Sequence, residues 1–418
     1  MSSDIAGAMR IAIAGAGIGG LCTALALRQR GFAVEVYEQA GQLGEVGAGL
    51  QLSPNGTRVL RSLGLEATLQ PWVCEAARKE VRHYANGRRW KLFDLGADCR
   101  ARFGAPYWMV HRGDLHRVLL QALQAQDPRA VRLDARVVDA VTQGDRVRFT
   151  LADGSRREAH ALIACDGVHS VLRRQLLGDD AARFTGLLAW RGLVPMTALP
   201  EHLRTRAGEH VGTNWVGPGA HVITYPVRAG ALMNVVGIVE RSDWQAESWT
   251  QPGTVDELLQ DFHAWHEDVR TLMGAIEQPF KWALLGRQPR RGWAQGRICL
   301  SGDAAHPTLP FLAQGANMAL EDAVVMADCL AGGGSVEQGL QRFETLRWQR
   351  TADIVNRSAD NAARFHNPAL ADPSFAEAYI DREWDSEKVR HRYDGLFEYD
   401  ALTAAVLSAP APASPEHA

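Results

Sequence analysis

Several features that define particular protein classes are missing from this sequence. The six cysteines lie far apart without a CxxC pair, and several sit inside apolar runs. We therefore expect reduced thiols in the core, with neither disulfides nor a metal site. Lysine and arginine number 45 against 48 acidic residues, the net charge is −3, and no basic block stands out. This balance disfavours nucleic acid or an anionic membrane as a partner and favours a small molecule.

The first apolar stretch also lacks the marks of a targeting segment. Four glycines, at positions 15, 17, 19 and 20, interrupt it, and neither a charged n-region nor a cleavage site accompanies it. It predicts no signal peptide and no membrane anchor, so a cytoplasmic location is the expectation. With 418 residues, 46% of them hydrophobic, the chain is long enough for two or three domains around a substantial core.

What is present begins with the pattern of a dinucleotide-binding unit. An apolar strand-like run, Ile11 to Ala14, leads into Gly15-Ala16-Gly17-Ile18-Gly19-Gly20, and a helical run and a second strand-like run follow. In such a unit the three spaced glycines permit the tight turn, the approach of a pyrophosphate and close helix packing. The free amides of the helix start then face the phosphates. Glu38, 18 residues past Gly20, is placed to bind an adenosine ribose.

Three segments further along leave alternatives open. A loop dense in glycine, from Gly44 to Gly56, predicts either a close approach of the backbone to a flat group or an ordinary flexible loop. Polar strand-like residues around Asn86-Gly87 predict a β-hairpin outside the α/β pattern. Arg112 precedes a helical run, where its guanidinium either reaches a phosphate or flavin edge or is an ordinary surface arginine.

Two more apolar strands end at acidic residues. Ala161 to Cys165 runs into Asp166-Gly167, where the acid is either a ligand at a switch point of the sheet or a helix N-cap. Arg297 to Ser301 runs into Gly302-Asp303, a proline-rich loop and a glycine-opened helix. The free N-terminal end of that helix carries partial positive charge, which suits an anion developing on a ring.

Between Phe184 and Trp282 the pattern changes to alternating strands. His221, Ile223 and Tyr225 share one face there. The histidine and the phenol either handle a phenolic proton or belong to an ordinary core. A single helix is expected from Asp256 to Met273, in which His263 and His266 are structural, because no third metal ligand accompanies them.

Three motifs in order carry a family resemblance: Gly15-x-Gly17-x-x-Gly20, then Asp166-Gly167 with Ser170 and Arg173, then Gly302-Asp303 with His306-Pro307 and Gln314-Gly315. From about Arg10 to Ala363 the chain resembles the single-component flavoprotein aromatic hydroxylases. The branch is the one with salicylate hydroxylase, 3-hydroxybenzoate 6-hydroxylase and 6-hydroxynicotinate 3-monooxygenase. Glu38 and Asp303, two acids far apart in the chain, also favour the extended FAD over NAD.

The resemblance implies an α/β fold in which a Rossmann-type FAD-binding domain is interleaved with a mixed β-sheet substrate domain. We expect residues 1–75, 100–183 and 283–365 in the first and residues 76–99 and 184–282 in the second. A C-terminal helical segment, 366–408, would follow. Residues 409–418, rich in proline and alanine, predict a disordered tail.

The resemblance also implies which residues contact a tightly bound FAD. They are Gly15, Gly17, Ile18, Gly20, Glu38, Gly49, Arg112, Val137, Asp166, Asp303, Pro307, Gly315, Ala316 and Asn317. The chain has no second complete GxGxxG, which agrees with NADH or NADPH visiting transiently. Molecular oxygen would be the co-substrate, and a homodimer is common in the family.

The implied activity is ring hydroxylation of a small aromatic acid through a flavin C(4a)-hydroperoxide. The favoured reaction is 6-hydroxylation of 3-hydroxybenzoate to gentisate. Conversion of salicylate to catechol and 3-hydroxylation of 6-hydroxynicotinate are the alternatives. A flavin oxidase or dehydrogenase, and a flavin-binding protein without enzymatic activity, are the readings from other classes.

His221 and Tyr225 are the predicted catalytic residues and would contact the substrate hydroxyl, because the resembling enzymes carry a histidine and a tyrosine at this spacing. Gln51, Pro310 and Phe311 complete the predicted substrate site. Two departures stand out, since Phe311 and Gln51 occupy positions where some of these enzymes have histidine. The substrate carboxylate is then left without a charged partner, and Gln51 and backbone amides are the remaining candidates.

Overall fold

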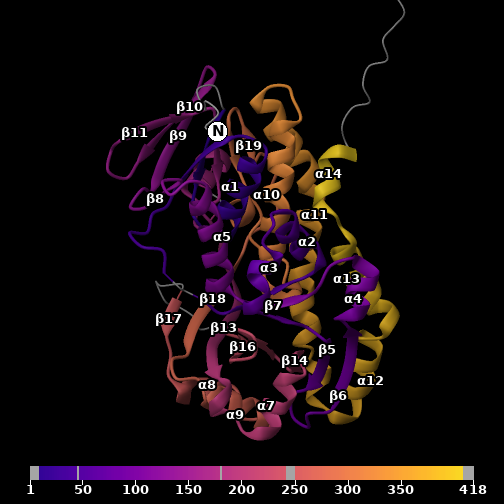
Figure 1. Cartoon of the computed structure of the whole chain (residues 1–418). Coiled ribbons are helices and arrows are strands. Elements are labelled where there is room, and N and C mark those ends of the chain that lie inside the picture. Colours follow the sequence, from indigo (N-terminus) through magenta and orange to yellow (C-terminus); the bar gives the residue numbers. More distant parts are fainter. Residues whose placement is uncertain (1–8, 45–46, 179–180, 242–249, 408–418) are drawn as a thin grey trace, which may run out of the picture.

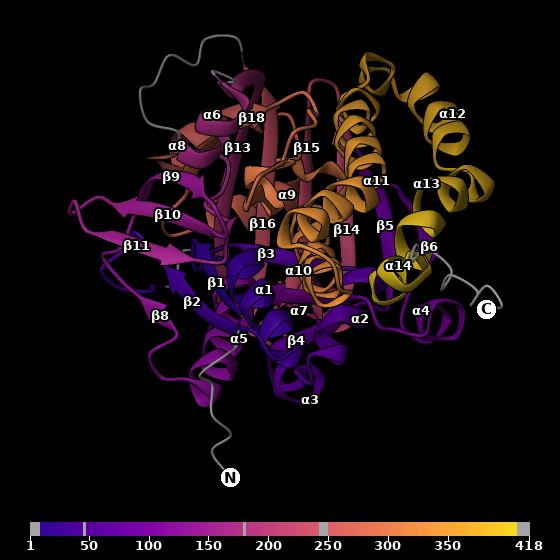
Figure 2. The ribbon, with the colours of Figure 1, turned by 90° about the horizontal axis from the view of Figure 1, so that it is seen from above.

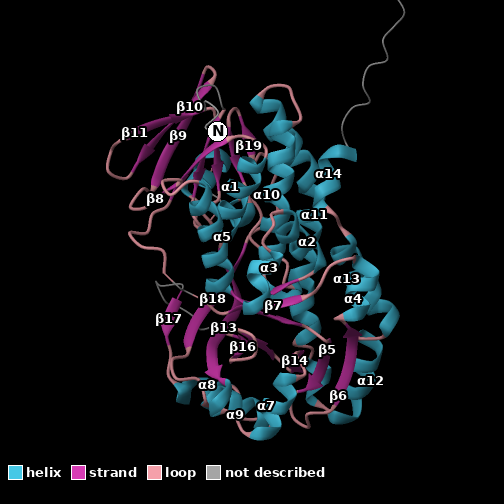
Figure 3. Ribbon diagram, in the orientation of Figure 1, coloured by secondary structure: helices cyan, strands magenta, loops and turns pink. Residues whose placement is uncertain are grey.

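Two sheets lie at opposite ends of the molecule, with helices between and beside them (Figures 1 and 3). The computed structural model describes residues 9–44, 47–178, 181–241 and 250–407. The expected disordered tail, 409–418, lies outside these ranges. The predicted α/β fold with a second, mixed sheet and C-terminal helices is confirmed. The exact domain boundaries stay a prediction.

The first sheet has six strands in the order β19-β20-β12-β1-β2-β8. They are β1 (Arg10–Ala14), β2 (Ala33–Tyr37), β8 (Val131–Arg132), β12 (Ala161–Ala164), β19 (Ala294–Gln295) and β20 (Ile298–Leu300). All neighbours pair in parallel except β19 and β20. β1 lies between β2 and β12, so the strand order reverses beside it, and the carboxyl end of β1 is the position where open α/β sheets bind ligands.

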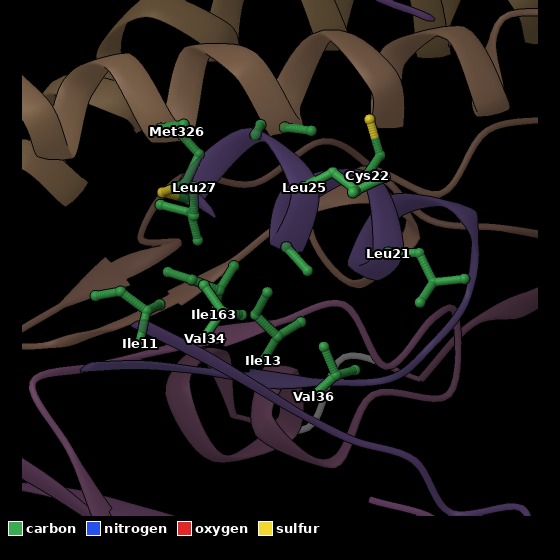
Figure 4. Close-up of a cluster of buried hydrophobic side chains, with 14 of the residues drawn as sticks. Ile11, Ile13, Leu21, Cys22, Leu25, Leu27, Val34, Val36, Ile163 and Met326 are labelled. Carbon is green, nitrogen blue, oxygen red and sulfur yellow. The ribbon is translucent and has the colours of Figure 1, made fainter. Parts of the chain in front are cut away.

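Helix α1 (Ile18–Gln29) packs against this sheet. It also contacts α5 (Arg112–Gln126) and α10 (Gly315–Ala331). α1 is buried along nearly its whole length because it is apolar on every side. In Figure 4, Ile13 and Val36 from the strands and Leu25 from α1 meet in one apolar cluster, with Met326 of α10 beside it. This packing fixes the glycine turn that precedes α1.

The second sheet has eight strands in the order β17-β18-β13-β16-β15-β14-β5-β6. They are β5 (Arg78–His83), β6 (Arg89–Asp94), β13 (Arg183–Pro195), β14 (Val211–Gly217), β15 (Ala220–Val227), β16 (Leu232–Glu240), β17 (Thr250–Pro252) and β18 (Phe280–Gly286). The sheet is antiparallel except where β14 pairs in parallel with β5. The predicted hairpin at Asn86-Gly87 joins β5 to β6.

Each face of the eight-stranded sheet packs against a different part of the chain. The outer face is covered by α7 (Glu201–Gly208), α8 (Val255–Asp261) and α9 (Glu267–Gly274), which lie below the sheet in Figure 1. The inner face packs on β7 (Trp108–His111) and on the loop before α10. Side chains that point inward therefore approach the part of the chain that carries the third motif.

The prediction of one helix from Asp256 to Met273 was wrong. The chain forms α8 and α9 with a break between them, where the side chains of Phe262 and Trp265 are buried. The His266 ring accepts a hydrogen bond from the amide of Asp268 and so caps α9. This cap begins a new helix, which the apolar spacing alone does not predict. Among the described residues, no group of three or more potential ligands is arranged to hold a metal ion.

Two three-stranded sheets and several helices complete the fold. The strands are β3 (Gly49–Leu52), β4 (Val73–Glu75), β7 (Trp108–His111), β9 (Val137–Gln143), β10 (Arg146–Leu151) and β11 (Arg156–Ala159). The helices are α2 (Pro54–Ser62), α3 (Glu66–Leu69), α4 (Ala97–Phe103), α6 (Val171–Leu177), α11 (Val336–Phe365), α12 (Pro373–Glu383), α13 (Ser386–Glu398) and α14 (Ala401–Leu407). Seen from above, α12 and α13 lie beside β6 (Figure 2). Within the described ranges, no helix has both the length and the apolar character needed to cross a bilayer.

Candidate active site

The turn between β1 and α1 is shaped by its glycines. Gly15 has a φ of +100°, and a Cβ there would lie 2.5 Å from the carbonyl oxygen of Cys165. A Cβ on Gly20 would lie 1.9 Å from the carbonyl oxygen of Gly15. Around Gly17, by contrast, an added Cβ would meet no atom within 4 Å. The first and third glycines therefore serve the protein's own packing, and the second borders open space that can admit a phosphate.

Glu38 lies beside this turn. Its carboxylate accepts hydrogen bonds from the amides of Ala16, at 2.7 Å, and Ala40, at 2.9 Å. The backbone carbonyl of Glu38 accepts a hydrogen bond from Ala135, two residues before Val137 at the start of β9. The structure thus gathers the residues predicted for the adenosine end of FAD, including Ile18 at the first position of α1.

The second motif follows β12. One carboxylate oxygen of Asp166 accepts a hydrogen bond from the amide of Val171 at 3.2 Å, and the other has no partner among the described residues. Burial raises the pKa of this carboxyl. The N-cap of α6 is Ser170, whose hydroxyl accepts from the amide of Arg173 at 2.9 Å. Ser170 is therefore the N-cap residue, Asp166 binds the first amide of α6 with one oxygen, and its other oxygen is available to a ligand.

Arg173 connects the second motif to the third. Its buried guanidinium donates to the carbonyl oxygens of Ala304, at 2.9 Å, and Ala305, at 2.6 Å. These carbonyls belong to the turn that contains Asp303, directly after β20. Two motifs that are more than 130 residues apart in the chain are thus held together by one side chain.

Asp303 and Arg112 face each other across the site. Both side chains are exposed to solvent. The protein that surrounds Asp303 on its other sides raises the pKa of its carboxyl, and the positive charge of Arg112 opposes this shift. Arg112 is the first residue of α5, and its amide donates to the carbonyl of Ala48 at 3.1 Å. An acid and a guanidinium so placed can bind a ribityl hydroxyl and a pyrophosphate.

Asp322, a buried acid on α10, forms hydrogen bonds that hold the third motif in place. One oxygen of Asp322 accepts hydrogen bonds from His306, at 2.6 Å, and from the amide of Gly302, at 3.0 Å. The other oxygen accepts from Arg347 at 2.7 Å. These contacts hold the pKa of Asp322 well below its usual range despite complete burial. The sequence analysis missed this residue, although an acid inside an apolar helical run is a visible signal.

The loop that precedes α10 is fixed by Asn317. The fully buried side chain of Asn317 donates to the carbonyl oxygens of Ala313, at 2.7 Å, and Gln51, at 3.2 Å. It also accepts from the amide of Ser53 at 3.1 Å. Because these bonds engage the Asn317 side chain within the protein, a ligand would meet the start of α10 through the backbone of Gly315, Ala316 and Asn317. Pro307 lines one side of a cavity of about 390 Å³ next to this loop.

Tyr225 and Gln51 are brought together at the inner face of the eight-stranded sheet. The side-chain oxygen of Gln51 accepts from the hydroxyl of Tyr107 at 2.8 Å, and the Gln51 side chain lies close enough to Tyr225 to act on the pKa of its hydroxyl. Burial raises the pKa of Tyr225 far above its ordinary value. Gly49 permits this approach, because a Cβ there would lie 2.5 Å from the ring of Tyr225. The amide of Gly49 donates to Asn234 at 2.6 Å.

His221 lies four residues earlier on β15 and is fully buried. Its Nδ1 shares a hydrogen bond with Nε2 of His366 at 2.6 Å, and Nδ1 of His366 lies 3.1 Å from Glu240, whose side chain is 59% exposed. Nε2 of His221 has no partner among the described residues. The ring centre of Phe311 is 5.3 Å away. An ordinary core histidine would have both nitrogens satisfied, so this geometry favours a ligand for Nε2.

Burial, and to a smaller extent the neighbouring His366, hold the pKa of His221 well below its usual value. The ring is therefore neutral at neutral pH and can accept a proton. Burial also lowers the pKa of His366, which Glu240 opposes. The three side chains form a continuous hydrogen-bonded chain from the sheet's inner face to solvent.

The family follows from comparison with known proteins. Residues 8–358 match the family model described as FAD binding domain. The chain is 40% identical over 361 residues to 3-amino-4-hydroxybenzoate 2-monooxygenase PtnB3 of Streptomyces platensis, covering 86% of this chain and 89% of that protein. The chain belongs to the FAD-dependent aromatic hydroxylases.

Two further comparisons agree with this assignment. The hydroxylase is 35% identical over 357 residues to 3-hydroxybenzoate 6-hydroxylase 1 of Aquipseudomonas alcaligenes, covering 83% of this chain and 87% of that protein. A solved salicylate hydroxylase substrate complex superposes with a TM-score of 0.78 at 28% identity, over 97% of this chain and 99% of that chain. The family prediction and the prediction of an FAD-dependent aromatic-ring monooxygenase are confirmed.

Two cations on the sheet's inner face were missed in the sequence. Lys79 on β5 is 8% exposed and has neither a hydrogen bond nor an ion pair within the described ranges. Arg191 on β13 is half-buried, and its guanidinium lies 5.1 Å from the ring centre of Trp282. Neither residue lies in a motif, and only the strand register of this hydroxylase reveals that both point inward.

Proposed function

We propose that this monooxygenase uses NADH or NADPH and molecular oxygen to hydroxylate a small benzoate that carries a hydroxyl or amino group. The observation that carries the proposal is the inner face of the eight-stranded sheet. There, a neutral buried base, His221, and a hydrogen-bonding group, Tyr225 with Gln51, lie on one strand beside the loop that holds the third motif.

The residues of the first and third motifs fit an FAD molecule. The open space beside Gly17 suits a pyrophosphate, Glu38 is positioned for a ribose, and Arg112 and Asp303 suit the ribityl and phosphate groups between them. When bound, FAD supplies the electrons that activate oxygen for insertion into the ring. Free amides at the start of α10 favour negative charge on the flavin ring.

We assign proton transfer to the chain of His221, His366 and Glu240. A substrate hydroxyl donates its proton to Nε2 of His221 while Nδ1 passes its own proton to His366. His366 in turn releases a proton to Glu240, which exchanges with water. The phenolate formed is a better nucleophile than the phenol at its ortho and para carbons, which include C6 of 3-hydroxybenzoate. In 3-amino-4-hydroxybenzoate the 3-amino group activates C2, and the base holds the 4-hydroxyl. Phe311 and the sheet exclude water from this step.

The substrate class is proposed from what the named relatives' reactions share. 3-Hydroxybenzoate and 3-amino-4-hydroxybenzoate both carry a carboxylate at position 1 and an electron-donating group at position 3. Oxygen enters para to that group in 6-hydroxylation and ortho to it in 2-hydroxylation. The relative at 40% identity favours 3-amino-4-hydroxybenzoate, and 6-hydroxylation of 3-hydroxybenzoate to gentisate is the second candidate.

A substrate panel tests the proposal. Purified enzyme loaded with FAD is mixed with NADH or NADPH and, separately, 3-amino-4-hydroxybenzoate, 3-hydroxybenzoate, salicylate and 6-hydroxynicotinate. We expect oxidation of the reductant to be stimulated by a 3-substituted benzoate, with one hydroxylated product formed per reductant consumed. Stoichiometric hydrogen peroxide without any ring product would instead support an oxidase.

A further inference from the structure

We propose that Lys79 binds the carboxylate of the substrate. The inference rests on the proposed function, because it assumes an aromatic acid as substrate. It answers the question that the sequence leaves open, namely which charged group pairs with that acid where Gln51 and Phe311 replace histidines.

The first observation is that Lys79 has no anionic partner among the described residues. The side chain is 8% exposed, and its ammonium group makes neither a hydrogen bond nor an ion pair with any described residue. This burial lowers the pKa of the amine to about 7. A buried ammonium without a counter-ion is unfavourable, and an arriving carboxylate removes that cost. The environment of Lys79 is therefore suited to an anionic ligand.

The second observation is the direction of the side chain. Lys79 pairs with Gly212 on β14. An added Cβ on Gly212 would lie 3.4 Å from Cγ and 3.6 Å from Cε of Lys79, so the lysine side chain lies over the glycine. On the next strand Thr213 pairs with Thr224, which sets Gly212 opposite Tyr225. The absence of a side chain at position 212 thus leaves a path from Lys79 toward Tyr225.

The third observation is the polar group that Lys79 borders. Its Nζ is 5.2 Å from the ring centre of Tyr107. The hydroxyl of Tyr107 donates to Gln51, and the Gln51 side chain lies near the hydroxyl of Tyr225. A carboxylate held there by the ammonium can accept further hydrogen bonds from these groups. His221 lies four residues along β15 from Tyr225, so the rest of the ring would extend toward the base.

Arg191 is the other unpaired cation of this face, and it is less suited to the role. Its guanidinium lies near the hydroxyl of Tyr225 but also near the like charge of Arg112, and the two act on its pKa in opposite directions. Arg191 is half-buried and lies over the ring of Trp282. Water therefore screens its charge more than that of Lys79, and a carboxylate gains less by binding it. The acid nearest Lys79 in sequence, Glu80, points to the opposite face of the strand and accepts from Thr213.

The test compares ligands that differ only by the carboxylate. Oxidised enzyme loaded with FAD is titrated with 3-amino-4-hydroxybenzoate and with 2-aminophenol, and binding is followed by calorimetry and flavin absorbance, without reductant. In Lys79→Met we expect the dissociation constant of the acid to rise about 100-fold. Affinity for 2-aminophenol should stay within about threefold, because no charge pair is lost. Lys91→Met is the matched control, since Lys91 lies on the neighbouring strand β6, is exposed and pairs with Asp94.

A measurement on the wild-type enzyme tests the same proposal without depending on the folding of Lys79→Met. Between pH 7 and 9, affinity for the acid should fall about tenfold per pH unit. In the free enzyme the Lys79 amine loses its proton above a pKa of about 7, whereas in the complex the paired carboxylate keeps that amine protonated. The tyrosines that face Lys79, Tyr107 and Tyr225, have raised pKa values and do not titrate in this range. Affinity for 2-aminophenol should stay constant between pH 7 and 9.

Three results would overturn the assignment to Lys79. They are equal effects of Lys79→Met on both ligands, no effect on either, and loss of acid selectivity in Arg191→Met but not in Lys79→Met. Failure of the proposed function is a separate result, in which the aromatic acids bind but are not hydroxylated. If the acids are hydroxylated but Lys79→Met binds them as tightly as the wild type does, the role of Lys79 is refuted and the proposed function stands.

Discussion

The two ends of the active site are built on different principles. The cofactor end uses backbone geometry within one short stretch, Gly15 to Glu38, together with two acids at strand ends. The substrate face collects single side chains, such as Lys79, His221 and Tyr225, from separate strands of the eight-stranded sheet. The first end is common to enzymes that bind the same cofactor, whereas the second can change with single substitutions. The predictions below test this difference.

The largest effect is expected at Gly17, where fold and cofactor binding can be separated. An added Cβ there meets no protein atom within 4 Å, so Gly17→Val should fold but lose bound FAD. The measurement is the ratio of flavin to protein after purification, with circular dichroism as the check on folding. Gly208→Val, also in open space, is the control and should keep its flavin. Flavin-loaded Gly17→Val would refute the assignment of this space to the cofactor.

At the substrate face, His221→Gln should leave FAD content unchanged and slow hydroxylation. Loss of a general base typically costs 10²- to 10⁴-fold, so we expect a decrease of about 100-fold or more in the rate of product formation. Single-turnover measurement of product reports this rate. His263→Gln provides the control, because His263 is exposed and hydrogen-bonds only its own helix segment. Equal rates in His221→Gln and wild type would remove His221 from the mechanism.

The contacts of Asp322 that hold the third motif in place should contribute to the free energy of unfolding. Asp322→Asn removes the charge that His306 and Arg347 share, leaves Arg347 with Glu321 alone, and should lower the free energy of unfolding by about 3 kcal/mol. Asp328→Asn on the same helix breaks a partly exposed pair with Arg30 and should cost about 1 kcal/mol or less. Urea unfolding of the two variants measures the difference. Similar values for both would show that burial of the Asp322 network adds no stability.

The smallest effect is expected at the solvent end of the proton chain. Glu240→Gln should slow hydroxylation by less than about tenfold, because water can replace an exposed carboxylate as the final acceptor. Single-turnover rates in water and in deuterium oxide measure this effect, and the solvent isotope effect should increase in the variant. Glu209→Gln, another exposed acid bound to Arg78, is the control. A loss as large as that in His221→Gln would contradict the order of this chain.

The sequence predicts the cofactor end well because its determinants are local. A strand, a glycine turn, a helix and an acid occur within 28 residues, and Asp166 and Asp303 directly follow apolar strands. The shared face of His221 and Tyr225 is also predictable, because side chains alternate along a strand. In these cases the spacing in the chain determines the spacing in space.

The rest could not be predicted, because it depends on pairing between distant segments. Lys79 is a charged residue in a polar stretch, and only its pairing with Gly212 shows that it is buried. His366 reaches His221 across 145 residues. The side chain of Asn317 is used to anchor Gln51, which no spacing in the sequence indicates. Such contacts follow from tertiary packing rather than from local pattern.

The central claim is that residues from the glycine turn to the start of α10 would hold FAD, which would supply the electrons for inserting one oxygen atom into an aromatic acid held at the sheet's inner face. The most direct test is turnover of 3-amino-4-hydroxybenzoate or 3-hydroxybenzoate with ¹⁸O₂ and NADH, followed by mass spectrometry of the product. The account predicts a product that contains one ¹⁸O atom, and no label when the reaction is run in H₂¹⁸O with ordinary oxygen. Label arriving from water, or reductant consumed to peroxide with every acid unchanged, would contradict it.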